Sequence, residues 1–490
     1  MTQSPPKDIS TETATRYERL FIAIICLIAG ARIFIFSAAL PFFTNVDEIS
    51  HFDLVYKYSQ GRLPAAPLEK CDPNAVRIII HNTTGEYYDL PTYRSPQWLA
   101  ESTSFLCNSN NRETWAWPSY YLLAGLWCRL GISLGLGDGQ LLYWIRFLNV
   151  PLMAVLVWVS YLVAVRVFPE NRHCRLSLPI LVAFFPQDIF FYITGDALSP
   201  PAFTAAFMML LSIYLSEKSL RYHLIAGFVV AVTFLTKVSN IAIVALAVVV
   251  MLLKIKQAVS QGQFKNYLPC LTVFVAAAAI PVAIWLGRNY ILFGDIIGSA
   301  AVFNERGWEV KPLAQIFAHP IFGGRGLFTF LTELTKTFWR GEVIWRDKRM
   351  ALPFADFFYV ITSAVFFIAC LARLILNKSE KPLTIALKMS FFVVSVSILF
   401  LAFASMRFEF GEFVYPSCEY PYFTSGRLIA GTIVPFLVLY IAGLHYILSK
   451  FRLASRLLVI VVIIAAVITI SEIILTWPVF SSPYNWFHLK

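Results

Sequence analysis

The chain has 490 residues, of which 58% are hydrophobic and only 14% are charged, and its net charge is +11. This composition excludes an ordinary soluble protein and is typical of a protein that crosses a membrane many times. The lysines and arginines occur in short clusters between apolar runs, so we assign them to membrane orientation and predict no nucleic-acid partner.

Eleven apolar runs are long enough, or almost long enough, to cross about 30 Å of hydrocarbon, which requires about 20 helical residues. The first run is too long for a secretory signal and no small-residue cleavage site follows it, so we expect it to stay attached. We therefore predict an all-α polytopic membrane protein, with residues 1–490 as a single membrane domain. The predicted spans are residues 20–40, 142–166, 177–194, 198–216, 222–236, 239–253, 267–287, 356–372, 389–405, 428–448 and 457–476.

Basic residues orient these spans. With eleven spans, the clusters that contain Arg16, Arg172 and Lys254 fall on the side of the amino terminus, which the positive-inside rule makes cytoplasmic. A twelfth span at residues 118–137 would reverse every later loop, so we expect this segment to lie along the outer surface. The large extracytosolic segments are then residues 41–141, 288–355 and 406–427.

The first outer segment begins with two acids and a histidine at helical spacing. Asp47 and His51 are four residues apart and Glu48 and His51 three apart, which places their side chains on one side of a helix. Apolar residues such as Phe52 and Tyr56 predict a short amphipathic helix at the membrane surface. The acids can accept a proton or bind a metal, and the alternatives are that Asp47 only caps the helix and that Glu48 is a first-turn acid favoured by the helix dipole.

The rest of this outer segment holds aromatic residues and two cysteines, and we expect it to pack as surface helices over the bundle. Tyr120 and Tyr121 belong to an aromatic-rich run, which is typical of the membrane interface and can also stack against a sugar. Cys71 and Cys107 can form a disulfide in an oxidising compartment or stay unpaired, because spacing alone does not fix cysteine pairing.

Polar residues at the outer ends of later spans form a second set of candidates. Asp196 follows the third span and either caps the next helix or faces Asp47. Lys237 lies where the positive-inside rule disfavours lysine, so it either snorkels or has an anionic partner. Arg288 and Arg427 lie at the ends of spans on the same side, either as headgroup anchors or as ligands of a phosphate.

Two charges fall inside apolar runs, Arg32 in the first run and Glu472 in the last. A charge near the middle of a membrane costs about 3 kcal/mol, so Arg32 should snorkel outward or pair with an acid or a lipid phosphate. Glu472 poses the same question.

The outer motifs resemble those of the C-type glycosyltransferase superfamily, which includes protein O-mannosyltransferases, the lipid A aminoarabinose transferase and oligosaccharyltransferase. The acidic start is most similar to a bacterial domain-of-unknown-function family within it, whose signature is DExxHF followed by a glycine. The matching residues are Asp47, Glu48, His51, Phe52 and Gly61. Further matches are TGDALSPP at 194–201, FLTKVSN at 234–240, RNYILFGD at 288–295, FWRGEVIW at 338–345 and SGRLIAGTIVP at 425–435. Leu428 departs from the pattern, which has an aromatic residue there.

The resemblance implies an enzyme that transfers a sugar, with inversion, from a polyprenyl-phosphate donor to an acceptor of unknown class at the periplasmic face of the inner membrane. An acceptor hydroxyl needs a carboxylate within reach, and a lipid-phosphate leaving group needs cations. The implied catalytic residues are Asp47, Glu48 and Asp196, and the implied substrate-binding residues are Lys237, Arg288, Arg427, His51, Tyr120 and Tyr121. A divalent metal, Mg²⁺ or Mn²⁺, is optional in this superfamily and would be held by Asp47, His51 and Asp196.

Two other functions remain open on the residues alone. A flippase or transporter of lipid-linked sugars would place ionisable groups near the membrane midplane and often has inverted repeats, whereas here the acids gather on one outer face. A ligase or polymerase of surface polysaccharide shares the membrane, the substrate and the side. It would depend on outer-loop arginines more than on the acidic pair.

Overall fold

The computed structural model describes residues 16–44, 47–83, 95–346, 348–376, 382–411 and 415–488. Nearly all regular structure in these ranges is helical, and nine helical stretches there are long and apolar enough to cross a membrane. The predicted all-α polytopic membrane fold is therefore confirmed. The long helices are α1 (Arg16–Ala39), α7 (Asn149–Val167), α9 (Ser199–Leu215), α11 (Ile241–Ser260), α12 (Phe264–Phe293), α15 (Pro353–Leu376), α16 (Pro382–Arg407), α17 (Ile433–Lys450) and α18 (Leu457–Phe480).

Two of the predicted spans are shorter helices in the structure. Residues 177–194 include the end of α8 (Arg172–Ala183), which has 12 residues. The helix ends before Pro186, because a proline restricts the preceding residue to extended backbone and has no N–H to donate. Residues 222–236 correspond to α10 (Leu220–Phe234), which has 15 residues.

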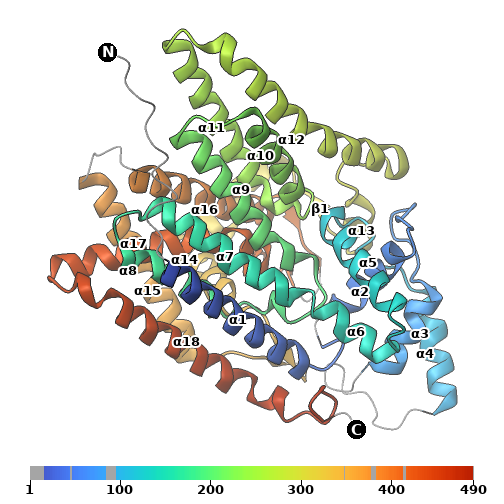
Figure 1. Ribbon diagram of the computed structural model, residues 1–490. Coiled ribbons are helices and arrows are strands. Elements are labelled where there is room, and N and C mark those ends of the chain that lie inside the picture. Colours follow the sequence, from blue (N-terminus) through green and yellow to red (C-terminus); the bar gives the residue numbers. More distant parts are fainter. Residues whose placement is uncertain are drawn as a thin grey trace.

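Five shorter helices, α2 to α6, gather at one end of the molecule (Figure 1). Asp72 and Ser95 cap α3 and α4 by accepting backbone N–H groups, and both helices begin with proline. On α5, Gly125 approaches α2 so closely that a Cβ would lie 2.7 Å from the Cβ of Tyr58, so the predicted surface segment packs on α2. The bounds are α2 (Glu48–Ser59), α3 (Pro73–Asn82), α4 (Pro96–Asn108), α5 (Pro118–Ser133) and α6 (Asp138–Arg146).

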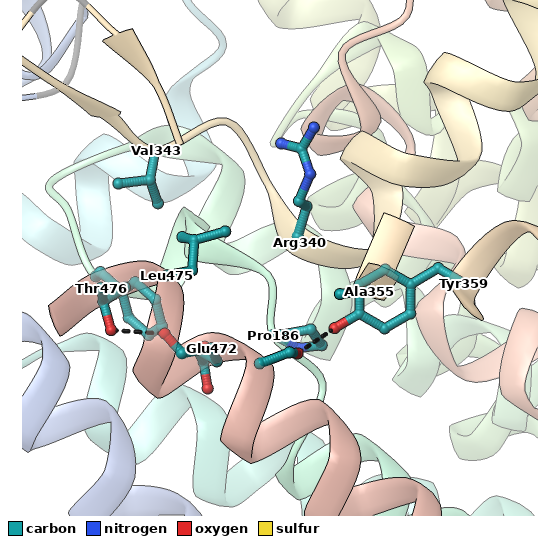
Figure 2. A pocket seen from close by; sticks show the side chains of 10 residues that line it. Pro186, Arg340, Val343, Ala355, Tyr359, Glu472, Leu475 and Thr476 are labelled. Carbon is teal, nitrogen blue, oxygen red and sulfur yellow. Dashed lines mark hydrogen bonds between the residues drawn. The ribbon is translucent and has the colours of Figure 1, made fainter. Parts of the chain in front are cut away.

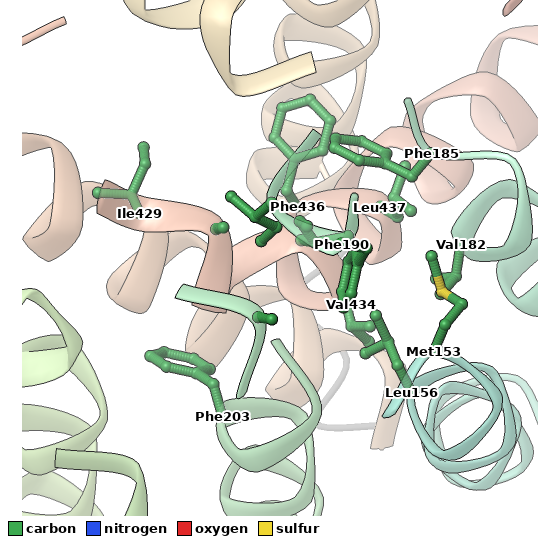
Figure 3. Packing of buried hydrophobic residues seen from close by; sticks show 14 of the residues in the cluster. Met153, Leu156, Val182, Phe185, Phe190, Phe203, Ile429, Val434, Phe436 and Leu437 are labelled. Atoms are coloured by element: carbon green, nitrogen blue, oxygen red, sulfur yellow. The ribbon is translucent and has the colours of Figure 1, made fainter. Parts of the chain in front are cut away.

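The most buried of the long helices is α17, which packs against α8, α15 and α16. Phe436 and Leu437 of α17 lie among aromatic and aliphatic side chains from α7, α8 and the 184–191 segment (Figure 3). The Phe436 ring centroid is 4.9 Å from that of Phe338 at the end of α14 (Gly324–Arg340). This core fixes the start of α17, and hence the segment just before it, relative to α14.

Short elements join the later outer segments. Strands β1 (Glu309–Val310) and β4 (Phe408–Glu409) pair antiparallel and thereby link the predicted second and third outer segments. Strands β2 (Ile344–Trp345) and β3 (Lys348–Arg349) form a second pair. The remaining short helices are α13 (Ala300–Glu305), η1 (Asp188–Phe190), η2 (Gly195–Leu198), η3 (Val238–Asn240), η4 (Leu313–Ala318), η5 (Pro320–Phe322), η6 (Gly426–Thr432) and η7 (Ala454–Arg456).

The two charges inside apolar runs pair with each other. Arg32 Nε of α1 lies 3.0 Å from Glu472 Oε2 of α18, and both residues are buried. Pairing offsets the cost of placing each charge in a low-dielectric interior. The alternative that Arg32 pairs with an acid therefore holds.

Cys71 and Cys107 contribute to one small apolar cluster with Val76 and Ile80, and both are free thiols in the structure. They are close in space without being bonded.

Candidate functional site

Four predicted site residues meet where the ends of helical segments converge. Asp47 precedes α2, and Asp196 lies in η2. Lys237 precedes η3, and Arg427 lies in η6. Arg427 Nη2 is 2.6 Å from Asp47 Oδ2, and Arg427 Nε is 3.9 Å from Asp196 Oδ2. The Lys237 ammonium pairs with the other Asp196 oxygen. We call these four residues and His51 the Arg427 cluster.

A side-chain hydrogen bond and a close glycine contact hold these chain ends together. Asn240 Nδ2, at the end of η3, donates to Ser199 Oγ at the start of α9 over 3.1 Å. Gly431 of η6 lies so close that a Cβ there would be 2.6 Å from Asn240 Oδ1. The FLTKVSN and SGRLIAGTIVP segments therefore pack on each other, which brings Lys237 and Arg427 to one place.

Asp47 is held ionised by Arg427. Burial alone would raise the pKa of the Asp47 carboxyl, but the Arg427 guanidinium, with contributions from His51 and Arg306, lowers it to about 2. Asp47 occupies the N-cap position of α2, yet its side chain makes no capping hydrogen bond. Its carboxylate therefore serves the cluster and not the helix end.

His51 is a neutral member of the cluster. Its Nδ1 lies 2.7 Å from the Tyr121 hydroxyl, and its Nε2 lies 3.5 Å from Thr194 Oγ1. Burial lowers the pKa of His51 to about 4, although the charges of Asp47 and Asp196 oppose this shift. At neutral pH the imidazole is therefore a polar hydrogen-bonding group and not a cation.

Glu48 has a different environment from its neighbour Asp47. Its side chain is fully buried, and Arg146 of α6 donates to both carboxylate oxygens over 2.8 and 2.7 Å. The backbone N–H groups of Phe43 and Ile193 donate to the same two oxygens. Each oxygen thus already accepts two hydrogen bonds, which leaves no open position for an acceptor hydroxyl. These contacts are those of a structural ion pair, and the catalytic role of Glu48 stays a prediction.

Three predicted substrate-binding residues are not open to a ligand at the cluster. Arg288 donates to a backbone carbonyl and lies 4.7 Å from the Trp285 ring centroid, and in the described part of the chain no contact joins it to the cluster. Tyr120 and Tyr121 are buried, so neither ring offers a face to a sugar. Tyr121 reaches the cluster through its hydroxyl, which contacts His51.

Glu113 was missed by sequence reasoning because it lies in a polar segment without a motif. Its N–H donates to Asn111 Oδ1 over 2.7 Å, and Asn111 Nδ2 in turn donates to Asp53 Oδ2 of α2 over 2.7 Å. These bonds hold Glu113 beside the first turns of α2. Burial raises the pKa of the Glu113 carboxyl to about 7, and the Asp47 charge adds to this effect while nearby cations oppose it.

Arg306 approaches the cluster from the segment after α13. Its guanidinium lies 5.2 Å from the Trp308 ring centroid. The adjacent ion pair between Arg112 and Glu305, at 3.3 Å, joins this segment to the one that carries Glu113. The buried Nε atom of Arg306 has no hydrogen-bond partner among the described residues, and neither has the Nε of Arg427. Buried donors are normally satisfied, so these two atoms are open positions for an anion.

A second pair of acids lies beside the start of η6. Asp188 Oδ2 accepts the Glu342 N–H over 3.1 Å, and Glu342 in turn accepts from the Ser425 hydroxyl. Gly341 has φ +72°, and a Cβ at this position would overlap the Asp188 carboxylate. The RGEV part of the FWRGEVIW motif therefore positions the segment that carries Arg427.

The predicted metal ligands do not form a metal site in the structure. Among the residues that the structure describes, no group of three His, Cys, Asp or Glu side chains is arranged to hold a metal ion. Arg427 contacts both Asp47 and Asp196, and Lys237 pairs with Asp196, so protein cations occupy the positions that a metal ion would take. Asp47, His51 and Asp196 therefore do not fit a metal in this arrangement.

A small, mostly apolar cavity of about 20 Å³ is lined by residues of α14, α15 and α18 together with Pro186, Phe191 and Val343 (Figure 2). Tyr359 on its wall bonds Ser471 over 3.0 Å, and Arg340 bonds Asp356 over 2.6 Å. The cavity shares no lining residue with the Arg427 cluster. Its volume suits about one water molecule, so it is too small for a sugar.

Comparisons with known proteins include a distant structural neighbour. No protein-family model matches the chain, and no curated protein matches it. The structure is similar to the crystal structure of the Archaeoglobus fulgidus oligosaccharyltransferase in complex with Zn and sulfate, with a TM-score of 0.45 and 14% identity. The match covers 92% of this chain and 53% of the neighbour, so the chain spans about half of that protein's length.

Proposed function

We propose that the protein is a membrane glycosyltransferase that moves a sugar from a polyprenyl-phosphate donor to an acceptor hydroxyl. The observation that carries this proposal is the contact of one guanidinium, that of Arg427, with two acids from distant segments, Asp47 and Asp196. Glycosyl transfer from a lipid phosphate needs a carboxylate beside a cluster of cations. The carboxylate accepts the proton of the acceptor hydroxyl, and the cations stabilise the negative charge of the leaving phosphate.

The donor phosphate is bound by the cations of the site. Arginine suits a phosphate because its planar fork of N–H groups matches two phosphate oxygens, and lysine adds a point charge. Arg427 keeps one Nε donor without a partner among the described residues, and Lys237 lies beside it on Asp196. A phosphate placed between Arg427 and Lys237 would complete both sets of hydrogen bonds.

Asp47 acts as the proton acceptor. The acceptor oxygen attacks the anomeric carbon, and the bond between that carbon and the phosphate oxygen breaks. The hydroxyl proton passes to Asp47, and polyprenyl phosphate leaves with the bonding electron pair. A single displacement of this kind inverts the anomeric centre.

The salt bridge between Asp47 and Arg427 links base strength to donor binding. With a pKa of about 2, the Asp47 carboxylate is a weak base while it is paired with Arg427. A donor phosphate that engages Arg427 partly neutralises the guanidinium, so the basicity of Asp47 rises when the donor is in place. The base is therefore activated only in the complex with the donor.

His51 and Asp196 position the reacting groups. Neutral His51 is fixed by Tyr121 and offers its second ring nitrogen to a sugar hydroxyl. Asp196 holds Lys237 by an ion pair and so orients the ammonium. Neither role needs a metal.

We place this chemistry on the extracytosolic, periplasmic side of the cell membrane, with the amino terminus in the cytoplasm. The positive-inside pattern supports this orientation, because the segments at 41–141, 288–355 and 406–427 then all face outward. Asp47, Arg306 and Arg427 come from these segments or their borders, so the site faces the side on which an outer acceptor is found.

The experiment is transfer by the purified protein in detergent or nanodiscs with a panel of radiolabelled polyprenyl-phosphate sugars. The proposal expects release of polyprenyl phosphate that depends on an added acceptor. Donor that is moved across a proteoliposome membrane without any cleavage would favour a flippase instead. Elongation of a glycan from lipid-linked oligosaccharide alone would favour a polymerase.

A further inference from the structure

An apolar groove of about 440 Å³ lies between α1 and α7, which pack side by side (Figure 1). Both helices belong to stretches that are long and apolar enough to cross a membrane, and every residue that lines the groove is apolar. The groove is therefore suited to a hydrocarbon chain from the surrounding lipid. Its lining residues are Ala23, Cys26, Leu27, Ala154, Val155 and Trp158.

The two helices run antiparallel, so the start of α1 lies beside the end of α7. A Cβ at Gly30 of α1 would lie 3.4 Å from Val150, near the start of α7. At the other end, the Tyr161 hydroxyl of α7 donates to Glu18 Oε2 of α1 over 3.2 Å. The groove lies between these two contacts along the helices.

Arginines extend both walls of the groove toward this end. Arg19 precedes Ala23 by four residues on α1, which places the two side chains on one face of the helix. Arg166 follows Trp158 by eight residues on α7, which is again the same face and about 12 Å along the helix axis. Arg19 is exposed and Arg166 is half-buried. Both can therefore reach a group that lies at the end of the groove.

A third arginine is held at this end by the buried carboxylate of Glu18. Arg175 of α8 donates to both oxygens of Glu18, over 3.0 and 2.8 Å. Arg172 approaches the same carboxylate through Nε alone, at 3.3 Å, and its side chain is 64% exposed. Tyr161, which donates to Glu18, lies 6.2 Å from the Trp158 ring in the groove wall, between ring centroids. Glu18 thus fixes Arg172 beside the groove and leaves its two amino groups exposed.

The charge at this end of the helices is strongly positive. Residues 16–19 and 166–175 contain five arginines and two glutamates, which gives three net positive charges with His173 neutral. In the predicted orientation this end is cytoplasmic, the side on which anionic lipids gather. A ligand of this place needs a long apolar chain and a negative charge at one end.

We propose that α1, α7 and the start of α8 bind an anionic phospholipid. One acyl chain lies in the groove, and the phosphate is bound by Arg19, Arg166 and Arg172. A zwitterionic phospholipid has the same chains, but the positive charge of its headgroup matches this end of the helices less well. The site lies at the start of α1, whereas Asp47 of the Arg427 cluster follows its other end, so this lipid is distinct from the sugar donor.

The test is quenching of tryptophan fluorescence by phospholipids that carry bromine on their acyl chains. The purified full chain is placed in vesicles of unlabelled phosphatidylcholine mixed with brominated phosphatidylglycerol, which has one negative charge, or with brominated phosphatidylcholine. The chain has 12 tryptophans, so quenching at the groove is the difference between wild type and Trp158→Phe. Phosphatidylglycerol should bind there at least about tenfold more tightly, because each arginine beside the headgroup contributes a factor of about five.

Variants separate the two parts of the site. Arg172→Gln and Arg19→Gln should each lower the preference for phosphatidylglycerol about fivefold, and the double variant should remove most of it. Arg221→Gln is the matched control, because it changes an exposed arginine on the same predicted side in α10, which packs on α9, α11 and α12. Ala23→Leu fills the groove and should weaken quenching by both lipids, whereas Ala279→Leu, at an exposed position of α12, should not.

Equal binding of the two brominated lipids at Trp158 would overturn the proposal, because the groove would then hold bulk lipid only. A preference that persists in the double variant of Arg19 and Arg172 would overturn it as well, and so would an equal loss in Arg221→Gln. The wild-type comparison of the two lipids decides the matter even where a variant does not fold.

Discussion

Arg427 Nη2 lies 2.6 Å from Asp47 Oδ2, although 380 residues separate the two in the sequence. This contact joins the start of the first surface helix to the segment before the most buried helix of the bundle. A guanidinium that is shared between a protein acid and an incoming phosphate changes the basicity of that acid when the phosphate binds. In the mechanism proposed above, this contact is what links donor binding to proton transfer.

Glu48→Gln should destabilise the protein more than any exposed substitution in the same region. Removal of one partner of a buried ion pair typically costs about 3–5 kcal/mol, because the Arg146 charge stays buried without a counter-charge. The measurement is thermal unfolding in detergent followed by tryptophan fluorescence. Asp138→Asn is the matched control, because its pair with Arg77 is exposed and such pairs contribute about 0–1 kcal/mol. Equal midpoints for the two variants would contradict the structural role of Glu48.

Reversal of the charges at Arg32 and Glu472 should rescue single substitutions. Glu472→Arg alone places two buried cations side by side, and Arg32→Glu alone does the same with two acids, so each should lower the unfolding midpoint strongly. The double variant restores an ion pair and should recover part of the loss. Additive destabilisation in the double variant would mean that the two side chains do not interact.

Gly341→Ala should be more damaging than Gly61→Ala. Both glycines have positive φ, +72° and +71°, so alanine is strained at either, and Gly341, with ψ −158°, lies in a region that essentially only glycine occupies. A Cβ at Gly61 meets nothing within 4 Å, whereas one at Gly341 overlaps the Asp188 carboxylate. We expect Gly341→Ala to lower both the unfolding midpoint and transfer, and Gly61→Ala to have the smaller effect. Indistinguishable variants would contradict both the backbone strain at Gly341 and its contact with Asp188.

His51 should make the protein less stable in mild acid. Its pKa falls from an ordinary 6.5 to about 4 on folding, so between these values the unfolded chain binds more protons than the folded one. The stability that His51 contributes is therefore complete above pH 6.5 and is lost as the pH falls toward 4. His51→Gln should flatten this part of the profile of unfolding midpoint against pH. A profile with the same slope in both proteins would assign the acid sensitivity to other groups.

Local pattern predicted much of the fold, because apolar runs and helix starts are encoded by neighbouring residues. Each predicted span has a helix at its position, and the helix after Asp47 begins at Glu48. The shortening of the span at 177–194 was not predicted. Its apolar composition continues past Pro186, whereas the helix ends at Ala183. The apolar composition thus indicates which residues are buried, whereas the proline limits how far the helix can continue.

The candidate site was predicted only where a residue was unusual for its place. Lys237 stood out because the predicted topology puts it on the outer side, where the positive-inside rule disfavours lysine. The structure brings it to Asp196. Glu48 looked equivalent to Asp47 in sequence, because its partner Arg146 is 98 residues away. Glu113 had no local signal, since only the packing of its segment on α2 brings it to the cluster.

The most direct test of the account is a single-turnover comparison of wild type with Asp47→Asn, with donor bound in advance and polyprenyl phosphate release measured after acceptor is added. Asparagine keeps the size of the side chain but cannot take the proton. We expect donor binding to be retained and release to fall by a factor of about 10²–10⁴, which is the usual contribution of a general base. Release at the wild-type rate would contradict the role of Asp47 as proton acceptor and with it the proposed mechanism.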